Sequence, residues 1–149
     1  MLQRAHATVD ERLPDRSQQA TLRLLGDEEL SAVVNRFVDA WSRGDVGSIA
    51  EMLTETASLA MPPTASWLRG RDTIVTFLRR TALDGTRSWR TLPTTANGQP
   101  AMATYLRDAS GRYLPYGVTV LTLAAGGIAE INTFRDPSAP ERFGLTNRL

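Results

Sequence analysis

The sequence has 149 residues, which fits a single domain, because domains cluster near about 100–150 residues. Hydrophobic residues make up 42% and charged residues 22%, and the formal net charge of +1 lacks the basic excess of a free-standing nucleic-acid-binding protein. The chain has no Cys and a single His, His6, which argues against a disulfide framework, a zinc site, an iron–sulfur cluster and Ser-His-Asp catalysis. We therefore predict neither a metal site nor a cofactor.

The first 26 residues differ in pattern from the rest of the chain. Residues 1–13 carry apolar side chains at helical spacing, which predicts a short amphipathic helix that ends at Pro14. Residues 15–21 are polar and without periodicity, so we assign residues 14–26 to a linker. The chain begins without the apolar core of a signal peptide, and no apolar run is long enough for a transmembrane helix. We expect a cytoplasmic protein with no membrane association.

The clearest helix pattern runs from Asp27, a good N-cap residue, to the position before Gly44. Its apolar positions form one stripe over three turns: Leu30, Val33, Val34, Phe37, Val38 and Trp41. Asp45 can cap a second, short helix. Residues 54–61 then predict a strand that is ended by Pro62.

The second half of the chain changes from helical to strand periodicity. A third helix follows Gly70, and after Gly85 the apolar residues recur at every second position. Asn97-Gly98 and residues 108–111 have the composition of hairpin turns. The predicted strands cover residues 89–95, 101–106, 113–123 and 128–134. Helices first and an antiparallel meander last indicate an α+β fold, with a sheet curved around the long helix.

Two stretches carry a family resemblance. FVDAWSRGDVGSIAEMLTETASLAMPP, followed by WLRGRDTIVTFL, resembles the SnoaL-like branch of the NTF2-like superfamily, and the resemblance covers residues 27–137. It implies a cone-shaped barrel in which helices pack on a curved, mostly antiparallel sheet around an internal pocket. Because this fold hosts isomerases, cyclases, hydrolases and non-catalytic modules, the resemblance says little about activity.

Narrower motifs resemble a group of transcription factors. MPPTASWLRGRDTI, SWRTLPTTANGQPAMATY and TFRDPSAPERFGL are similar to the C-terminal domain of certain actinobacterial extracytoplasmic-function (ECF) sigma factors of the sigma-G group, and LQRAHATVDERL resembles the end of sigma region 4. The resemblance divides the chain into a region 4 tail (1–13), a linker (14–26) and a SnoaL-like domain (27–149). It implies a fragment whose partners, RNA polymerase core and promoter DNA, are bound by sigma regions upstream of it.

Three positions bear on the chemistry of ketosteroid isomerase, a member of the superfamily. By resemblance, its oxyanion-hole Tyr, its base Asp and its second oxyanion donor fall on Phe37, Met61 and Thr119. Phe and Met cannot move protons, and Thr is a poor substitute for a buried acid. We therefore predict that the chain is not an enzyme and has no catalytic residues.

The aromatic and Met side chains suit a pocket for a small apolar molecule. From the resemblance and from strand alternation we expect a ligand pocket formed by Phe37, Met61, Trp67, Tyr105, Thr119 and Phe134, with the last four strands presenting Tyr105 and Phe134 on the concave face. The alternative is that the rings only fill the interior, which we favour for Phe77.

Two functions remain open at this point. The leading one is a regulatory domain that modulates transcription initiation by contacting sigma regions 2 and 4 of its own protein and by binding a small apolar ligand. The alternative is a free-standing SnoaL-like enzyme of the isomerase or cyclase type. Val118, Val120 and Thr122 are candidates for an outer sheet face through which members of this fold form homodimers.

Overall fold

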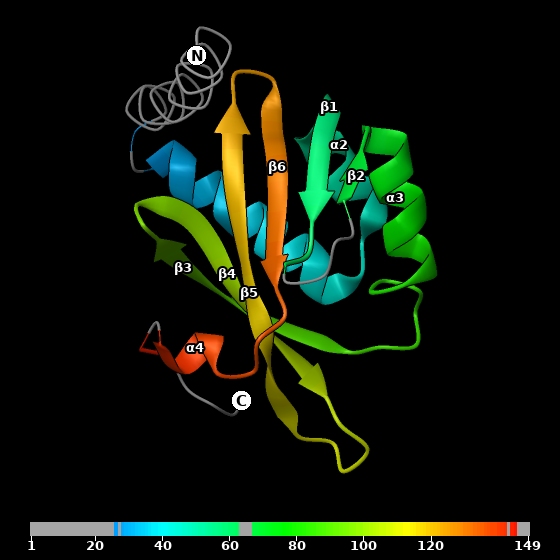
Figure 1. The fold of residues 1–149 in the computed structure, drawn as a ribbon, viewed down its shortest axis with the longest axis vertical. Helices are drawn as coiled ribbons and strands as arrows, with labels where there is room; N and C mark the ends of the chain where they lie inside the picture. The colour runs from blue at the N-terminus through cyan, green and yellow to red at the C-terminus, as the bar shows by residue number, and fades with distance from the viewer. Residues whose placement is uncertain (1–25, 27, 63–66, 143, 146–149) are drawn as a thin grey trace, which may run out of the picture.

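The structure, a computed structural model, describes residues 26, 28–62, 67–142 and 144–145 (Figure 1). The predicted helix of residues 1–13 lies outside the described residues, as does the predicted linker except for Gly26. The first helix is described over residues 28–43. The other elements are α2 (Val46–Met52), β1 (Leu53–Ala60), β2 (Trp67–Arg69), α3 (Arg71–Arg80), β3 (Trp89–Ala96), β4 (Gln99–Arg107), β5 (Tyr113–Ala124), β6 (Gly127–Phe134) and α4 (Ala139–Arg142).

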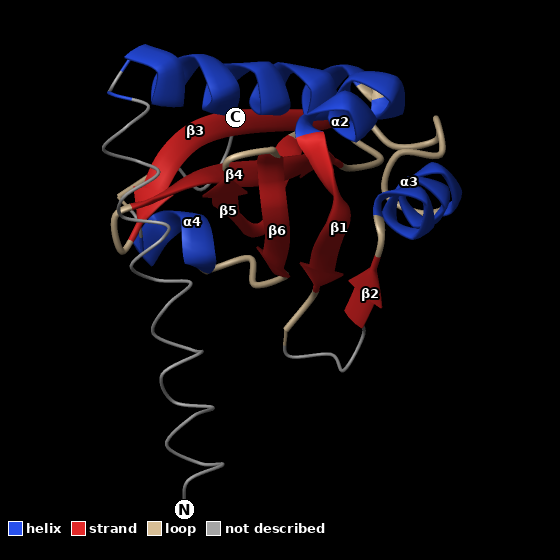
Figure 2. Cartoon of the chain, turned by 90° about the horizontal axis from the view of Figure 1, so that it is seen from above, coloured by secondary structure: helices blue, strands red, loops and turns tan. Residues whose placement is uncertain are grey.

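The strands form one six-stranded sheet in the order β2-β1-β6-β5-β4-β3. Neighbouring strands are antiparallel except β1 and β6, which run parallel at the centre of the sheet. Figure 2 shows the sheet curving beneath the first helix, with α2 beside that helix and α3 at the end of the sheet formed by β1 and β2. The predicted α+β fold with helices on a curved, mostly antiparallel sheet is confirmed.

The first helix closes the concave face because its apolar stripe packs onto the sheet. Val34, Phe37, Ala40 and Trp41 are all buried, and Phe37 is fully enclosed. Their spacing of three, four and seven places them on one side of the helix, as the sequence predicts. In the described part of the chain, no helix is both long and apolar enough to cross a membrane.

The helix boundaries follow the glycine and capping signals. Gly44 ends the first helix with a φ of +68°, a conformation that glycine adopts without strain. The Asp45 carboxylate then accepts a hydrogen bond from the backbone N–H of Ser48 at 3.1 Å and so caps α2. Hydrogen bonds from Ser48 to the Asp45 carboxylate also lower the pKa of that carboxyl below its ordinary value.

The hairpin turns lie where the sequence predicts them. Asn97 and Gly98 join β3 to β4 with φ angles of +53° and +79°, as a two-residue turn requires. Between β4 and β5, the Asp108 Oδ1 accepts hydrogen bonds from the backbone N–H groups of Ser110 and Arg112, each at 2.9 Å. The one strand that the sequence does not predict is β2, since three residues are too few to display a periodicity.

Candidate ligand-binding cavity

A cavity of about 210 Å³ lies between the concave face of the sheet, the first helix and α3. Its volume is below the range of about 300–1,000 Å³ that is usual for drug-sized ligands, so it suits a molecule of one or two rings. Most of its wall is apolar: Trp41, Leu59, Met61, Phe77, Trp89 and Tyr116 contribute the largest side chains.

Edge-to-face aromatic contacts organise one side of this wall. The Trp41 and Trp89 rings are 5.9 Å apart at 71°, and the Trp89 and Tyr116 rings are 4.9 Å apart at 88°. Such pairs add to the stability gained from burial alone. The Trp89 indole N–H donates a hydrogen bond to the carbonyl oxygen of Ala82 at 2.8 Å, which fixes the ring relative to the segment after α3. These contacts give the cavity a rigid wall.

The indole N–H of Trp41 differs from that of Trp89 in its hydrogen bonding. Trp41 is 4% exposed, and its Nε1 is the one buried side-chain nitrogen or oxygen without a hydrogen-bond partner among the residues that the structure describes. A buried donor without a partner costs about 1–3 kcal/mol. The Trp41 ring lines the cavity, but its N–H lies inside the packed wall and has no accessible surface.

Threonine hydroxyls provide polar groups on the sheet side of the cavity. Thr119 of β5 and Thr133 of β6 are buried, and their Oγ1 atoms are 3.0 Å apart. Thr104 of β4 donates its hydroxyl hydrogen to the carbonyl oxygen of Gly117 at 3.1 Å. Because one hydroxyl donates to the other in the Thr119–Thr133 pair, the accepting hydroxyl keeps its own hydrogen available for another partner.

Two arginines supply the positive charge of the cavity. Arg87, in the loop between α3 and β3, and Arg135, directly after β6, both line it, and both side chains belong to exposed residues. The lining contains no Asp or Glu. In the described ranges, no three His, Asp or Glu side chains gather in a way that could hold a metal ion.

The structure brings two of the six predicted pocket residues to this cavity. Met61, just after β1, and Thr119 both line it. Phe37 points inward as expected, but it is fully enclosed in the core next to Trp41, with ring centroids 6.1 Å apart. Phe37 thus contacts the aromatic wall through the Trp41 ring and does not itself line the cavity. The role of these residues in binding a ligand stays a prediction.

The other three predicted residues lie elsewhere. Trp67 of β2 is 56% exposed, and the Arg69 guanidinium is 5.1 Å from the centroid of its ring. Tyr105 is fully buried, and this burial raises the pKa of its phenol above the ordinary value, but Tyr105 does not line the cavity. Since its neighbour Thr104 lines the cavity, strand alternation turns Tyr105 toward the opposite face.

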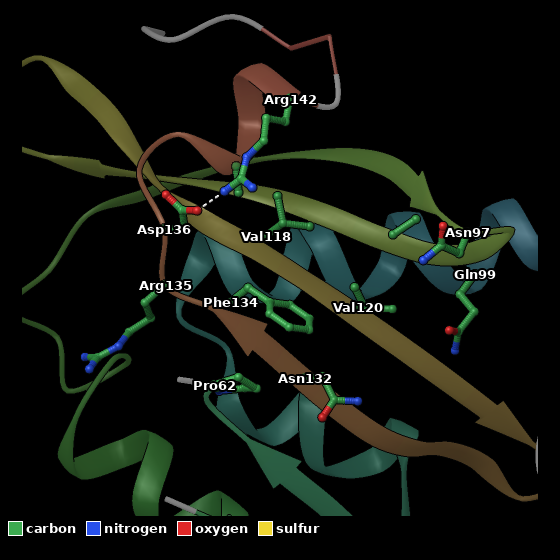
Figure 3. A pocket seen from close by; sticks show the side chains of 12 residues that line it. Pro62, Asn97, Gln99, Val118, Val120, Asn132, Phe134, Arg135, Asp136 and Arg142 are labelled. Carbon is green, nitrogen blue, oxygen red and sulfur yellow. Dashed lines mark hydrogen bonds and ion pairs between the residues drawn. The ribbon is translucent and has the colours of Figure 1, made fainter. Parts of the chain in front are cut away.

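Phe134 lies on the outer face of the sheet instead of the concave one. The β5–β6 register pairs Thr119 with Thr133, so Thr133 shares the cavity and Phe134 faces away from it. Phe134 lines a separate groove of about 600 Å³ next to α4, which Figure 3 shows with Val118 and Val120 on the same side. The expectation that Phe134 and Thr119 share the concave face is therefore wrong.

Several cavity residues were not predicted to line it. Phe77 is half-buried and lines the cavity, so it does more than fill the core. Tyr116 could not be placed by alternation, because the β4–β5 ladder shifts register between the pairs Thr104–Gly117 and Tyr105–Pro115. No pattern in the sequence marks Arg87 or Arg135, which lie in a loop and at a strand end.

Comparison with known proteins identifies the family of this chain. Residues 34–131 match the family model of the SnoaL-like domain. The chain is also 32% identical over 143 aligned residues to the ECF RNA polymerase sigma factor SigG of Mycobacterium tuberculosis. That match covers 90% of this chain and 38% of the sigma factor, so the chain spans well under half the length of these curated relatives.

Solved structures share the fold at low identity. An NTF2-like protein of unknown function from Mesorhizobium loti is 18% identical with a TM-score of 0.61, and the match covers 73% of this chain and 92% of that one. SalBIII, an epoxide hydrolase/cyclase-like enzyme of pyran ring formation in the polyether salinomycin, is 20% identical with a TM-score of 0.56 and the same coverage of both chains. The family model covers most of the described residues, and this chain belongs to the SnoaL-like domain family.

Proposed function

We propose that this chain is the regulatory C-terminal domain of an ECF-type alternative sigma factor. The observation that carries the proposal is the 32% identity with SigG, a match that covers 90% of the chain. The SnoaL-like family model covers residues 34–131 alone, so the similarity to SigG reaches beyond the family domain. Similarity beyond the shared domain supports a common architecture as well as a common fold.

In this proposal the chain acts through other parts of its protein. Residues 1–13 are the tail of sigma region 4, residues 14–26 are a linker, and the SnoaL-like domain contacts sigma regions 2 and 4. Those regions bind RNA polymerase core and promoter DNA in the cytoplasm, and the domain alters how they engage. A ligand in the cavity changes this regulation only if it binds one arrangement of the domains more tightly than the other.

The chemistry of the cavity supports a regulatory role over a catalytic one. Its ionisable groups are Arg87, Arg135 and Tyr116. None of the three is a His, Asp, Glu or Lys, the side chains that most often act as general bases. The positions that correspond to the isomerase acid and base groups hold Phe37, Met61 and Thr119. Such a cavity can bind an apolar molecule without moving its protons.

The reading frame upstream of Met1 and a transcription assay test the proposal together. We expect an open frame, continuous with Met1, that encodes sigma regions 2 and 4. The full-length protein should direct RNA polymerase core to initiate in vitro, and deletion of residues 27–149 should change transcript yield several-fold. Arg79→Gln, an exposed substitution on α3, serves as the control that leaves the yield unchanged.

The alternative function predicts different results. A frame without sigma regions, begun by its own ribosome-binding site at Met1, would contradict the regulatory proposal. Turnover of a steroid-like or polyketide-like substrate by the chain, lost when a cavity residue such as Met61 is changed, would establish a SnoaL-like enzyme in its place.

A further inference from the structure

We propose that the concave cavity binds a small apolar acid, a molecule of one or two rings whose carboxylate is bound by Arg87 and Arg135. This inference rests on the ligand-binding part of the proposed function and names the chemical class of the ligand. It follows from three features of the cavity: two arginines that form no ion pair, a lining that contains no carboxylate, and an apolar interior of limited volume.

The two cavity arginines form no ion pair, unlike five of the ten other arginines that the structure describes. Five arginines form ion pairs with carboxylates: Arg36 with Glu51, Arg43 with Asp39 and Asp45, Arg71 with Glu55, Arg112 with Asp108, and Arg142 with Asp136. Within the described ranges, Arg87 and Arg135 form no ion pair or hydrogen bond through their side chains. Both guanidiniums next to the apolar cavity are therefore available to an anion, apart from the electrostatic interaction of Arg87 with Asp84.

Asp84 is the acidic residue closest to Arg87 in the sequence, and its carboxylate already accepts hydrogen bonds from Thr86. Asp84 interacts electrostatically with Arg87, but its Oδ1 accepts hydrogen bonds from the Thr86 backbone N–H at 2.9 Å and from the Thr86 hydroxyl at 2.6 Å. These bonds hold the Asp84 carboxylate within its own turn. The Arg87 guanidinium keeps its hydrogens for a partner from outside the chain.

Arg135 borders both faces of the sheet at the end of β6. It is among the residues that line the outer groove as well as the cavity. In Figure 3 its side chain extends away from Phe134, whereas Asp136 and Arg142 pair with each other on the groove side. The one carboxylate of the groove is thus paired with Arg142, which leaves Arg135 free to bind an anion in the cavity.

The remaining polar groups of the cavity wall also favour a ligand that accepts hydrogen bonds. In the buried Thr119–Thr133 pair one hydroxyl donates to the other, so the accepting hydroxyl keeps its own hydrogen to donate. Together with the Arg87 and Arg135 guanidiniums, this gives the cavity hydrogen-bond donors, while its lining contains no carboxylate. A carboxylate accepts several hydrogen bonds and forms strong, often bidentate, bonds with guanidinium groups.

The apolar interior and the volume of the cavity determine which kind of group can be attached to the carboxylate of the ligand. Leu59, Phe77, Trp89 and Tyr116 surround the space with carbon atoms, which favours a hydrophobic ring over an inorganic anion. A volume of about 210 Å³ leaves room for a ring or a fused pair of rings. A flat acid with its carboxylate at the exposed arginines and its ring beside the indoles meets both conditions.

Calorimetric titration of the full chain tests the proposal with three acids: benzoate, cyclohexanecarboxylate and 2-naphthoate, each paired with its neutral amide. We expect at least one acid to bind at least tenfold more tightly than its amide, which corresponds to about 1.4 kcal/mol. Arg87→Gln and Arg135→Gln should each reduce this preference several-fold. Arg79→Gln makes the same charge change outside the cavity and should leave the preference intact.

Each other outcome contradicts the proposal. Equal affinity of acid and amide would show that charge does not select the ligand. A preference lost equally in Arg79→Gln would show a general charge effect, and no binding of any acid at 10 mM would show that the cavity does not take this class. None of these results bears on the regulatory function, because the transcription assay with residues 27–149 deleted is performed without a ligand.

Discussion

The two faces of the sheet are built from alternate residues of the same strands and yet differ in volume and in the helices that pack beside them. On the concave side, Thr119 and Thr133 face a cavity closed by the first helix and α3. On the outer side, Val118 and Phe134 face a groove next to the four-residue helix α4, and Phe134 remains 42% exposed. A shift of one residue along a strand thus decides which of the two sites a side chain lines.

This contrast in packing is the reason why we propose the ligand site on the concave side. The aromatic wall there is held by ring contacts and by the hydrogen bond from Trp89 to Ala82, so its shape is fixed before any ligand arrives. The outer groove is larger, and of its charged residues Asp136 pairs with Arg142 while Arg135 lines both the groove and the cavity. Substitutions on the two faces should therefore differ in their effects on stability.

The largest effect is expected where β5 passes closest to β6. A Cβ atom added to Gly117 would lie 2.1 Å from the backbone carbonyl oxygen of Phe134, so the strands would have to separate. Gly117→Ala should lower the free energy of unfolding by about 3 kcal/mol or more, measured by denaturant titration. Gly126→Ala is the matched control, because its Cβ would meet only the Thr54 methyl group at 3.6 Å. Similar losses in the two variants would contradict this packing.

A pair of truncations compares the two faces directly. Ile131 is fully buried against the concave core, and Phe134, three residues later, is partly exposed on the outer face. Ile131→Ala should cost about 2–5 kcal/mol of unfolding free energy because it leaves a cavity. Phe134→Ala should cost about 1 kcal/mol despite removing a larger side chain. A greater cost for Phe134→Ala would mean that the outer face carries the main core.

A third comparison concerns the two tryptophans of the cavity wall. The Trp89 N–H has a partner in the Ala82 carbonyl, whereas the Trp41 N–H is buried without one. Trp89→Phe should therefore destabilise the chain more than Trp41→Phe, by about 1 kcal/mol in thermal or denaturant unfolding. Equal losses would indicate that the Trp41 N–H is satisfied after all.

The smallest effect is expected at the ion pair beside α4. Arg142 and Asp136 pair across the outer groove, but their side chains are 66% and 41% exposed. Pairs this exposed contribute about 0–1 kcal/mol, so Arg142→Gln should change the unfolding free energy by less than about 1 kcal/mol. A loss of 2 kcal/mol or more would show that α4 is essential to the outer face.

The sequence predicted the elements other than β2 and the buried face of the long helix, but only part of the cavity. The apolar stripe of the first helix and the Asn97-Gly98 turn are local sequence patterns, and each of them is typical of one local structure. Phe134 was misplaced because its face depends on the pairing of β5 with β6, and a shift of one residue reverses it. Tyr116 follows a register shift, and Arg87 lies in a loop, so no periodicity points to either.

We propose that the concave cavity, and not the outer groove, receives the ligand. Methyl NMR of the full chain during titration with 2-naphthoate distinguishes the two sites, because Thr119 and Val118 are adjacent in sequence and face opposite sides. Ring currents of a bound naphthalene should shift the methyl signals of Met61, Thr119 and Thr133 and leave those of Val118 and Val120 in place. Shifts confined to Val118 and Val120 would place the ligand in the outer groove and contradict the claim.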